Sequence, residues 1–344
     1  VCVARGARLA GPGEFTLRAY LSGRLDLVQA EAVLELVEAQ SDLARRSAAL
    51  GLSKALSEQF QLIQDDITQV YGNIQAVFDY PEEGVPRAEF AGPLERALER
   101  IGRLLATSRA GGLAKHGARL ALIGRPNAGK SSLLNALLGY GRSIVSAEPG
   151  TTRDYLEAPL DIGGVPVTAI DTAGIRHTED SIEATGVTAA REIATHADVS
   201  LLLLDASRPL ADEDRELMHD LDPARTLFVA SKSDLPAAWS AAETNVAVCG
   251  VSSVTGRGVS ELKERVRSKL IGDAGATELW ITSERHTEAL TEIRDLLERA
   301  VAAPDDLAAL DLEAALRALA RITGRGEIAE ETLEHIFSHF CVGK

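Results

Sequence analysis

Residues Gly124-Arg-Pro-Asn-Ala-Gly-Lys-Ser131 fit the pattern G-x-x-x-x-G-K-[ST]. An apolar run at 119–123 precedes them, and a stretch typical of a helix follows at 132–138. A strand, a glycine loop and a helix in this order form the context in which such a loop binds phosphate. The glycines let backbone N–H groups converge on phosphate oxygens, and the helix N-terminus adds positive potential. The stretch therefore predicts binding of a nucleoside triphosphate.

Further residues are expected to contact the triphosphate and a magnesium ion. Lys130 neutralises phosphate charge, and the hydroxyl of Ser131 reaches Mg2+. Asp171 follows an apolar strand at 166–170, where a carboxylate can hold the water shell of Mg2+. Thr152 is the predicted Mg2+ ligand that signals an intact γ-phosphate. The full predicted set is Asn127, Ala128, Gly129, Lys130, Ser131, Ser132, Thr151, Thr152, Asp171, Thr172, Ala173 and Gly174.

The base-recognition motif is less regular. After an apolar run at 226–230, the stretch Ser231-Lys-Ser-Asp234 resembles N-K-x-D with Ser in the place of Asn. The carboxylate of Asp234 can accept two hydrogen bonds from guanine, which adenine does not offer in the same pattern. Ser231 removes an amide that would have reached the base or braced the loop. Lys232, Asp234, Ser252 and Ser253 are the predicted base contacts, and the order of the motifs predicts GTP.

The residue after the D-x-x-G motif is unusual. Many GTPases carry there the Gln that orients the attacking water, whereas this chain has Ile175, which can neither donate nor accept a hydrogen bond. Hydrolysis must therefore obtain its water-orienting group elsewhere. Glu183, before an apparent helix start, is our candidate. The alternative is that Glu183 is a solvated charge at a helix end.

Composition restricts the class of protein. The formal charge is −15 over 344 residues, which disfavours broad nonspecific binding of nucleic acid, because phosphate neutralisation needs a basic face. No run reaches the roughly 18 to 20 apolar residues of a membrane span. Cys2, Cys249 and Cys341 form no paired or metal-ligand spacing. These features predict a cytoplasmic protein without a membrane segment.

The hydrophobic pattern changes twice along the chain. Residues 23–115 are predicted to be mainly helical, with one helix that begins after Pro93 and ends near Gly111-Gly112. Residues 116–272 alternate short strands with helices, and Gly163-Gly164 predicts a hairpin and thus one antiparallel edge strand. Residues 273–344 are again predicted to be helical, at 284–302, 311–322 and 326–339. The predicted fold is an α/β P-loop GTPase domain with a mostly parallel sheet, inserted into a discontinuous all-α domain.

Five segments are shared with one known family. They are the stretch Gly11-Pro-Gly-Glu-Phe-Thr-Leu-Arg-Ala-Tyr-Leu-Ser-Gly-Arg-Leu-Asp-Leu27, the phosphate loop, G-T-T-R-D at 150–154, D-T-A-G-I-R at 171–176 and C-V-G-K at 341–344. Together they resemble the MnmE (TrmE) family of tRNA modification GTPases. The resemblance extends over the whole chain. Because the chain starts at Val1 without Met, we expect an N-terminal portion to be missing, and residues 1–22 then correspond to a remnant of the family's folate-binding domain.

The resemblance implies a function and site residues. Family members act with the flavoprotein MnmG to install an aminomethyl or carboxymethylaminomethyl group at C5 of the tRNA wobble uridine. They hydrolyse GTP with K+ and face-to-face dimerisation of their GTPase domains, in place of an arginine finger. By position, K+ ligands are implied at Asn127, Ser146, Glu148 and Thr151, and catalytic residues at Glu183 and Cys341. Carboxylate contacts to a 5-formyltetrahydrofolate-type cofactor are implied at Arg24 and Lys344.

Two other functions compete with this one. An Era-like ribosome-assembly GTPase shares G-x-P-N-x-G-K-S and also lacks the Gln, although such proteins usually carry a basic RNA-binding appendage. A GTP-dependent scaffold without meaningful turnover is compatible with Ser231 and Ile175. Arg24 also departs from the family pattern, since Lys is frequent there and the two cations differ in geometry.

Overall fold

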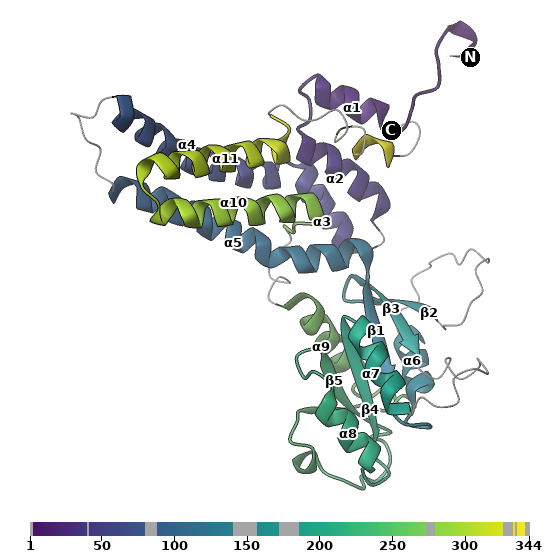
Figure 1. The fold of residues 1–344 in the computed structure, drawn as a ribbon. Coiled ribbons are helices and arrows are strands. Elements are labelled where there is room, and N and C mark those ends of the chain that lie inside the picture. Colours follow the sequence, from purple (N-terminus) through teal and green to yellow (C-terminus); the bar gives the residue numbers. More distant parts are fainter. Residues whose placement is uncertain are drawn as a thin grey trace. The chain divides into compact units, whose positions relative to one another are not determined.

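The computed structural model describes residues 3–39, 41–79, 88–139, 157–171, 186–272, 279–325, 333 and 336–340 (Figure 1). The chain divides into two compact units. One unit combines residues 1–115 with 276–344, and the other is the continuous stretch 116–275. We refer to them as the helical unit and the nucleotide unit.

The nucleotide unit is built on a six-stranded sheet with the order β2-β3-β1-β4-β5-β6. All neighbouring strands run parallel except β2 and β3, which pair antiparallel. The hairpin between these two turns at Gly163-Gly164, both at positive φ. The prediction of a mostly parallel sheet with one antiparallel edge strand is confirmed. The strands are β1 (Ala118–Ile123), β2 (Glu157–Ile162), β3 (Val165–Asp171), β4 (Val199–Asp205), β5 (Thr226–Ser231) and β6 (Val248–Gly250).

Helices pack on both faces of this sheet. Helices α6 and α9 contact each other and the sheet, and so do α7 and α8. Strand β4 is accordingly apolar on both sides, with Leu201 to Leu204 fully buried, as expected for a central parallel strand. The helices are α6 (Lys130–Gly139), α7 (Gly186–His196), α8 (Asp212–Asp220) and α9 (Val259–Ile271), with a short 3-10 helix η3 (Ala241–Glu243).

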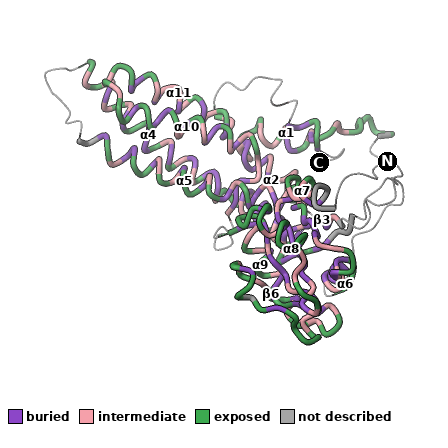
Figure 2. The backbone as a smooth tube through the Cα atoms, turned by 60° about the horizontal axis from the view of Figure 1, so that its bottom comes forward, coloured by how far each residue is buried: buried purple, intermediate pink, exposed green. Residues whose placement is uncertain are grey.

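The helical unit contains the remaining described helices. They are η1 (Val3–Arg5), α1 (Glu14–Leu21), α2 (Leu27–Glu38), α3 (Asp42–Leu52), α4 (Ala55–Asp79), α5 (Ala88–His116), α10 (Glu284–Ala302) and α11 (Asp305–Thr323). Helices from both parts of the sequence share one apolar core, which includes Phe60 of α4, Ile101 of α5, Leu290 of α10 and Leu312 of α11. Figure 2 shows buried and exposed residues alternating along these helices, as expected when each helix buries one face. The predicted discontinuous all-α domain is therefore confirmed.

Two helix boundaries differ from the sequence-based prediction. Helix α5 contains Pro93 and continues through Gly111-Gly112 to His116. Gly111 lies inside the helix, at a point where the helix backbone meets another segment: an added Cβ would lie 2.0 Å from the carbonyl oxygen of Ile281. This close approach explains a glycine at a position that does not end the helix. Helix α11 starts at Asp305, ahead of the predicted residue 311. Within the described residues, no helix combines the length and apolar character needed to cross a bilayer.

Candidate functional site

The phosphate loop joins the end of β1 to the start of α6. Gly124 has φ 143°, and a Cβ there would lie 2.5 Å from the carbonyl oxygen of Leu203. Gly129 also has positive φ, at 96°. Asn127 lies between them with φ 65° and an exposed side chain. Since glycine adopts these conformations without a Cβ penalty, the local sequence itself determines the shape of the loop.

The lysine of the loop is folded back over it. The Lys130 ammonium donates to the carbonyl oxygens of Gly124 at 2.7 Å and Arg125 at 3.0 Å. Lys130 is buried, whereas Ser131 and Ser132 are exposed on the first turn of α6. A cation held by loop carbonyls beside a helix N-terminus provides positive potential where phosphate oxygens are expected. The predicted phosphate contacts at 127–132 therefore lie together on the loop and on the first turn of α6.

Ser231 connects the predicted base-reading loop, which begins with the motif at 231–234, to the phosphate loop. Its hydroxyl donates to the carbonyl oxygen of Ala128 at 2.6 Å, and it also lies 3.2 Å from that of Leu204. The residue is buried, and it is separated from Ala128 by 103 positions. Serine removes the amide of the usual Asn, but its hydroxyl bonds to the phosphate loop. The hydroxyl proton of Ser231 is used in this hydrogen bond. The absence of the Asn amide therefore affects contact with the base and not the bracing of the loop.

Asp205, which the sequence analysis did not identify, holds the base-reading loop from β4. It accepts a hydrogen bond from the Lys232 ammonium at 2.6 Å, and Ser207 donates to it from both N at 3.0 Å and Oγ at 2.7 Å. Burial raises the pKa of Asp205, but the hydrogen bonds from Lys232 and Ser207 outweigh burial and hold it below its usual value. The sequence offered one signal for Asp205, which is its position at the end of an apolar strand. In the sheet, Asp205 pairs in register with Ser231.

The remaining predicted base contacts have different environments. Asp234 is exposed, and Ser253 is partly buried. Ser252 is fully buried, and its hydroxyl accepts a hydrogen bond from Thr255 N at 3.1 Å. Its own N–H donates to the carbonyl oxygen of Arg257. Ser252 therefore shapes its loop, whereas Asp234 has a side chain that is open to a ligand.

Several predicted residues lie outside the described part of the chain or in the other unit. Asp171 ends β3, and nothing further is described of its side chain. Arg24 belongs to the helical unit and is exposed beside a cavity of about 240 Å³ that Lys54 and Arg325 also line. Of the residues singled out from the sequence, those that lie outside the described ranges are Ser146, Glu148, Thr151, Thr152, Thr172, Ala173, Gly174, Ile175, Glu183, Cys341 and Lys344.

The brace at Ser231 leads to a prediction. Ser231→Ala should weaken GTP binding by about 5- to 10-fold, because a net hydrogen bond of about 1 kcal/mol is lost and the Ala128 carbonyl stays buried. Titration calorimetry with GTP and with GDP measures the change. The matched control is Ser233→Ala, since the Ser233 hydroxyl is buried with no hydrogen-bond partner among the described residues. Equal affinities for the two variants would assign Ser231 to packing alone.

Comparisons with known proteins identify relatives of this chain. A family profile described as the MnmE helical domain matches residues 27–341. The tRNA modification GTPase MnmE of a strain of Thermus thermophilus is 52% identical over 344 residues, covering 100% of this chain and 77% of the relative. The protein of the same name from Roseiflexus sp. (strain RS-1) is 40% identical over 361 residues, covering 99% of this chain and 78% of the relative.

One solved structure that this chain resembles is part of an iron transporter. The G domain of the T. maritima FeoB iron transporter covers 44% of this chain and 98% of its own length, at 27% identity and a TM-score of 0.33. With a profile match over more than half of its length and a relative 52% identical along all of it, this chain belongs to the MnmE family.

Proposed function

We propose that this chain is a GTPase that binds Mg2+·GTP in the nucleotide unit and acts in tRNA modification. The observation that carries the proposal is the glycine loop with a buried Lys130 at the start of α6, in a chain that belongs to the MnmE family. The residues fit a triphosphate, because the loop leaves no room for a Cβ at Gly124 and presents the exposed Ser131 at the helix start. Bound Mg2+ would offset phosphate charge next to that hydroxyl.

The finer mechanism concerns the charge that develops during hydrolysis. Ile175 replaces the usual Gln, so we assign the orientation of water to Glu183. We assign a K+ ion to Asn127, Ser146, Glu148 and Thr151, where it would offset charge between the β- and γ-phosphates. Asn127 supports this assignment, because its exposed side chain lies on the phosphate loop itself.

The wider activity follows the curated relatives, which are named tRNA modification GTPases. We propose that the chain acts in the cytoplasm with the flavoprotein MnmG to modify C5 of the wobble uridine with an aminomethyl or carboxymethylaminomethyl group, using Cys341. Its GTPase domains would form a homodimer in the GTP state. Arg24 and Lys344 would contact the carboxylates of a 5-formyltetrahydrofolate-type cofactor, and the exposed Arg24 side chain beside a cavity is consistent with this role.

The test of this function is phosphate release from GTP in K+ and in Na+ at equal ionic strength. We expect stimulation by K+ only, and Asn127→Ala should keep Mg2+·GTP affinity while reducing the K+-stimulated rate by about 100-fold, as for loss of one group that stabilises transition-state charge. Undiminished stimulation in the variant would remove Asn127 from the cation site. Absence of turnover in either salt would favour the scaffold, and binding of ribosomal RNA without MnmG would favour the Era-like alternative.

A further inference from the structure

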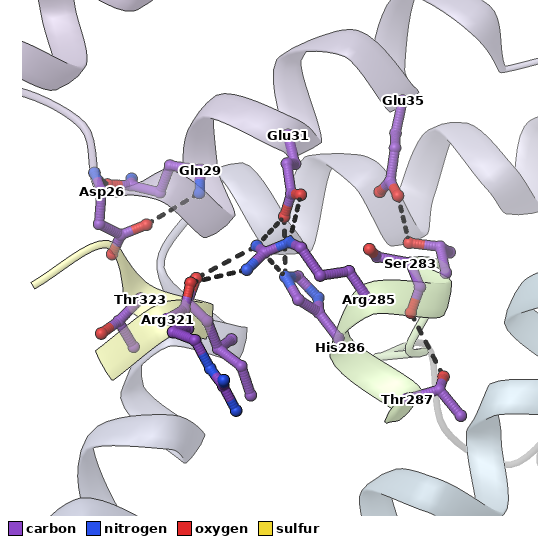
Figure 3. Close-up of polar contacts among 12 residues, drawn as sticks. Asp26, Gln29, Glu31, Glu35, Ser283, Arg285, His286, Thr287, Arg321 and Thr323 are labelled. Atoms are coloured by element: carbon purple, nitrogen blue, oxygen red, sulfur yellow. Dashed lines mark hydrogen bonds and ion pairs between the residues drawn. The ribbon is translucent and has the colours of Figure 1, made fainter. Parts of the chain in front are cut away.

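Helix α2 carries two carboxylates one turn apart, Glu31 and Glu35, that no step of GTP hydrolysis uses. Both bond to the segment at the start of α10, about 250 residues later in the chain (Figure 3). We call Glu31, Glu35, Thr282, Arg285 and His286 the α2 carboxylate network. All five residues belong to the helical unit.

Glu31 forms a buried ionic cluster. Its two oxygens accept hydrogen bonds from Arg285 Nε at 3.0 Å and Nη2 at 2.8 Å, and His286 Nε2 lies 2.7 Å away. His286 is only 3% exposed and packs edge-on against Phe60. Buried ion pairs are expensive to desolvate and often no more stabilising than apolar residues of similar volume. This energetic balance favours a positional role for the cluster in addition to stability.

Glu35 lies where the chain leaves and re-enters the helical unit. Its Oε1 accepts a hydrogen bond from the Thr282 hydroxyl at 2.5 Å and lies 3.6 Å from the ammonium of Lys115. Lys115 is the last residue before the nucleotide unit, and the chain returns from that unit at residue 276. One carboxylate thus contacts both ends of the insertion on the helical side.

The returning segment is held firmly against α5. Trp280 and Ile281 are almost completely buried. The N–H of Ile281 donates to the Thr107 hydroxyl at 3.1 Å, and the Ile281 carbonyl lies close to the backbone at Gly111. Because this segment has little freedom of its own, a displacement imposed on it must be shared by α5 and α2.

The network continues toward the C-terminal end of the chain. The Arg285 guanidinium donates to the carbonyl oxygens of Arg321 at 2.7 Å and Ile322 at 3.3 Å, in the last turn of α11. At the start of α2, Leu27 and Ala30 pack against Phe337 and Phe340, which shortly precede Cys341 in the sequence. Helix α2 therefore contacts the insertion ends, α11 and the residues before Cys341.

We propose that the α2 carboxylate network transmits the nucleotide state of the inserted unit to the end of α11 and to the segment before Cys341, with Glu35 as the positioning residue. This inference rests on the proposed function, since it requires that the inserted unit binds GTP. A nucleotide-dependent change in these segments is the property that distinguishes coupling from mere spatial continuity.

Hydrogen exchange with mass spectrometry on the full chain provides the test. Addition of the non-hydrolysable analogue GppNHp with Mg2+ should change exchange in residues 279–287 and 319–325 by about fivefold or more, the usual size of such coupling. Glu35→Gln and, separately, Thr282→Val should keep GTP affinity and turnover but lose this change. Glu35→Gln removes the negative charge that faces Lys115, and Thr282→Val removes the hydrogen bond to Glu35. The double variant should lose the change as each single variant does, because both act on the same carboxylate.

The control is Glu38→Gln, which makes the same charge change at an exposed position of α2 and should respond as the unaltered chain does. An unchanged response in Glu35→Gln and Thr282→Val would overturn the inference. So would absence of any response in the unaltered chain when GppNHp binds and GTP is hydrolysed. If the proposed function itself were wrong, the unaltered chain would neither bind GTP nor hydrolyse it. That result differs from the two outcomes that overturn the inference.

Discussion

Glu31→Ala is expected to lower the free energy of unfolding of the helical unit by about 3–5 kcal/mol, because it leaves the Arg285 charge and the His286 ring without their buried carboxylate partner. Hydrogen exchange of α10 peptides in the full chain measures the effect on this unit separately, and peptides of the nucleotide unit are the internal reference. Glu38→Ala on the same helix is exposed and should change stability by no more than about 0.5 kcal/mol. Equal effects of the two substitutions would contradict the prediction.

The same cluster makes the effect of Glu31→Ala depend on pH. Burial raises the pKa of Glu31, but the adjacent His286 and Arg285 outweigh burial and lower it from 4.5 to about 2. A carboxyl group whose pKa is lower in the folded state stabilises the fold above its unfolded pKa and loses that contribution as pH falls. The difference between the unaltered chain and the variant should therefore be full above pH 4.5 and shrink steadily toward pH 2. A difference that stayed constant over this range would contradict the assignment to charge.

Gly111→Ala is expected to destabilise the helical unit by about 3 kcal/mol or more, because the added methyl group would lie 2.0 Å from the carbonyl oxygen of Ile281. The neighbouring glycine provides a matched control. A Cβ at Gly112 would meet nothing within 4 Å, so Gly112→Ala should instead stabilise α5 by about 1 kcal/mol through helix propensity.

The two glycine variants differ by one position in the same helix, so their opposite signs separate tertiary contact from propensity. Hydrogen exchange of α5 and α10 peptides measures both. If Gly111→Ala proved as stabilising as Gly112→Ala, the close approach of α5 to Ile281 would be wrong. The segment that returns from the nucleotide unit, which Thr282 links to Glu35, would then not be held rigidly against α5.

Local patterns predicted much of the nucleotide unit. The phosphate loop follows from glycine positions and flanking apolar runs, because its shape depends on backbone conformations that few other residues adopt. The antiparallel edge strand follows from Gly163-Gly164 for the same reason. Helix 284–302 was predicted with its observed limits, since its apolar residues recur at helical spacing.

Boundaries and roles that depend on distant residues were not predictable in this way. Gly111-Gly112 predicted a helix end, but the tertiary contact with Ile281 explains a glycine inside α5. Asp205 was not identified because its role requires Lys232 beside it. Ser231 was interpreted from a motif, whereas its bond to Ala128 depends on how the strands assemble.

By itself, the sequence of this protein determined the fold class, the phosphate loop and the family, since these rest on residues that are near neighbours in the chain. Only the tertiary structure decided what Ser231, Asp205 and the α2 carboxylate network do. Their partners are 103, 27 and about 250 positions away, respectively. The physical reason is that a polar side chain acquires its role from the burial and the partners that folding provides, and neither is encoded in its immediate neighbours.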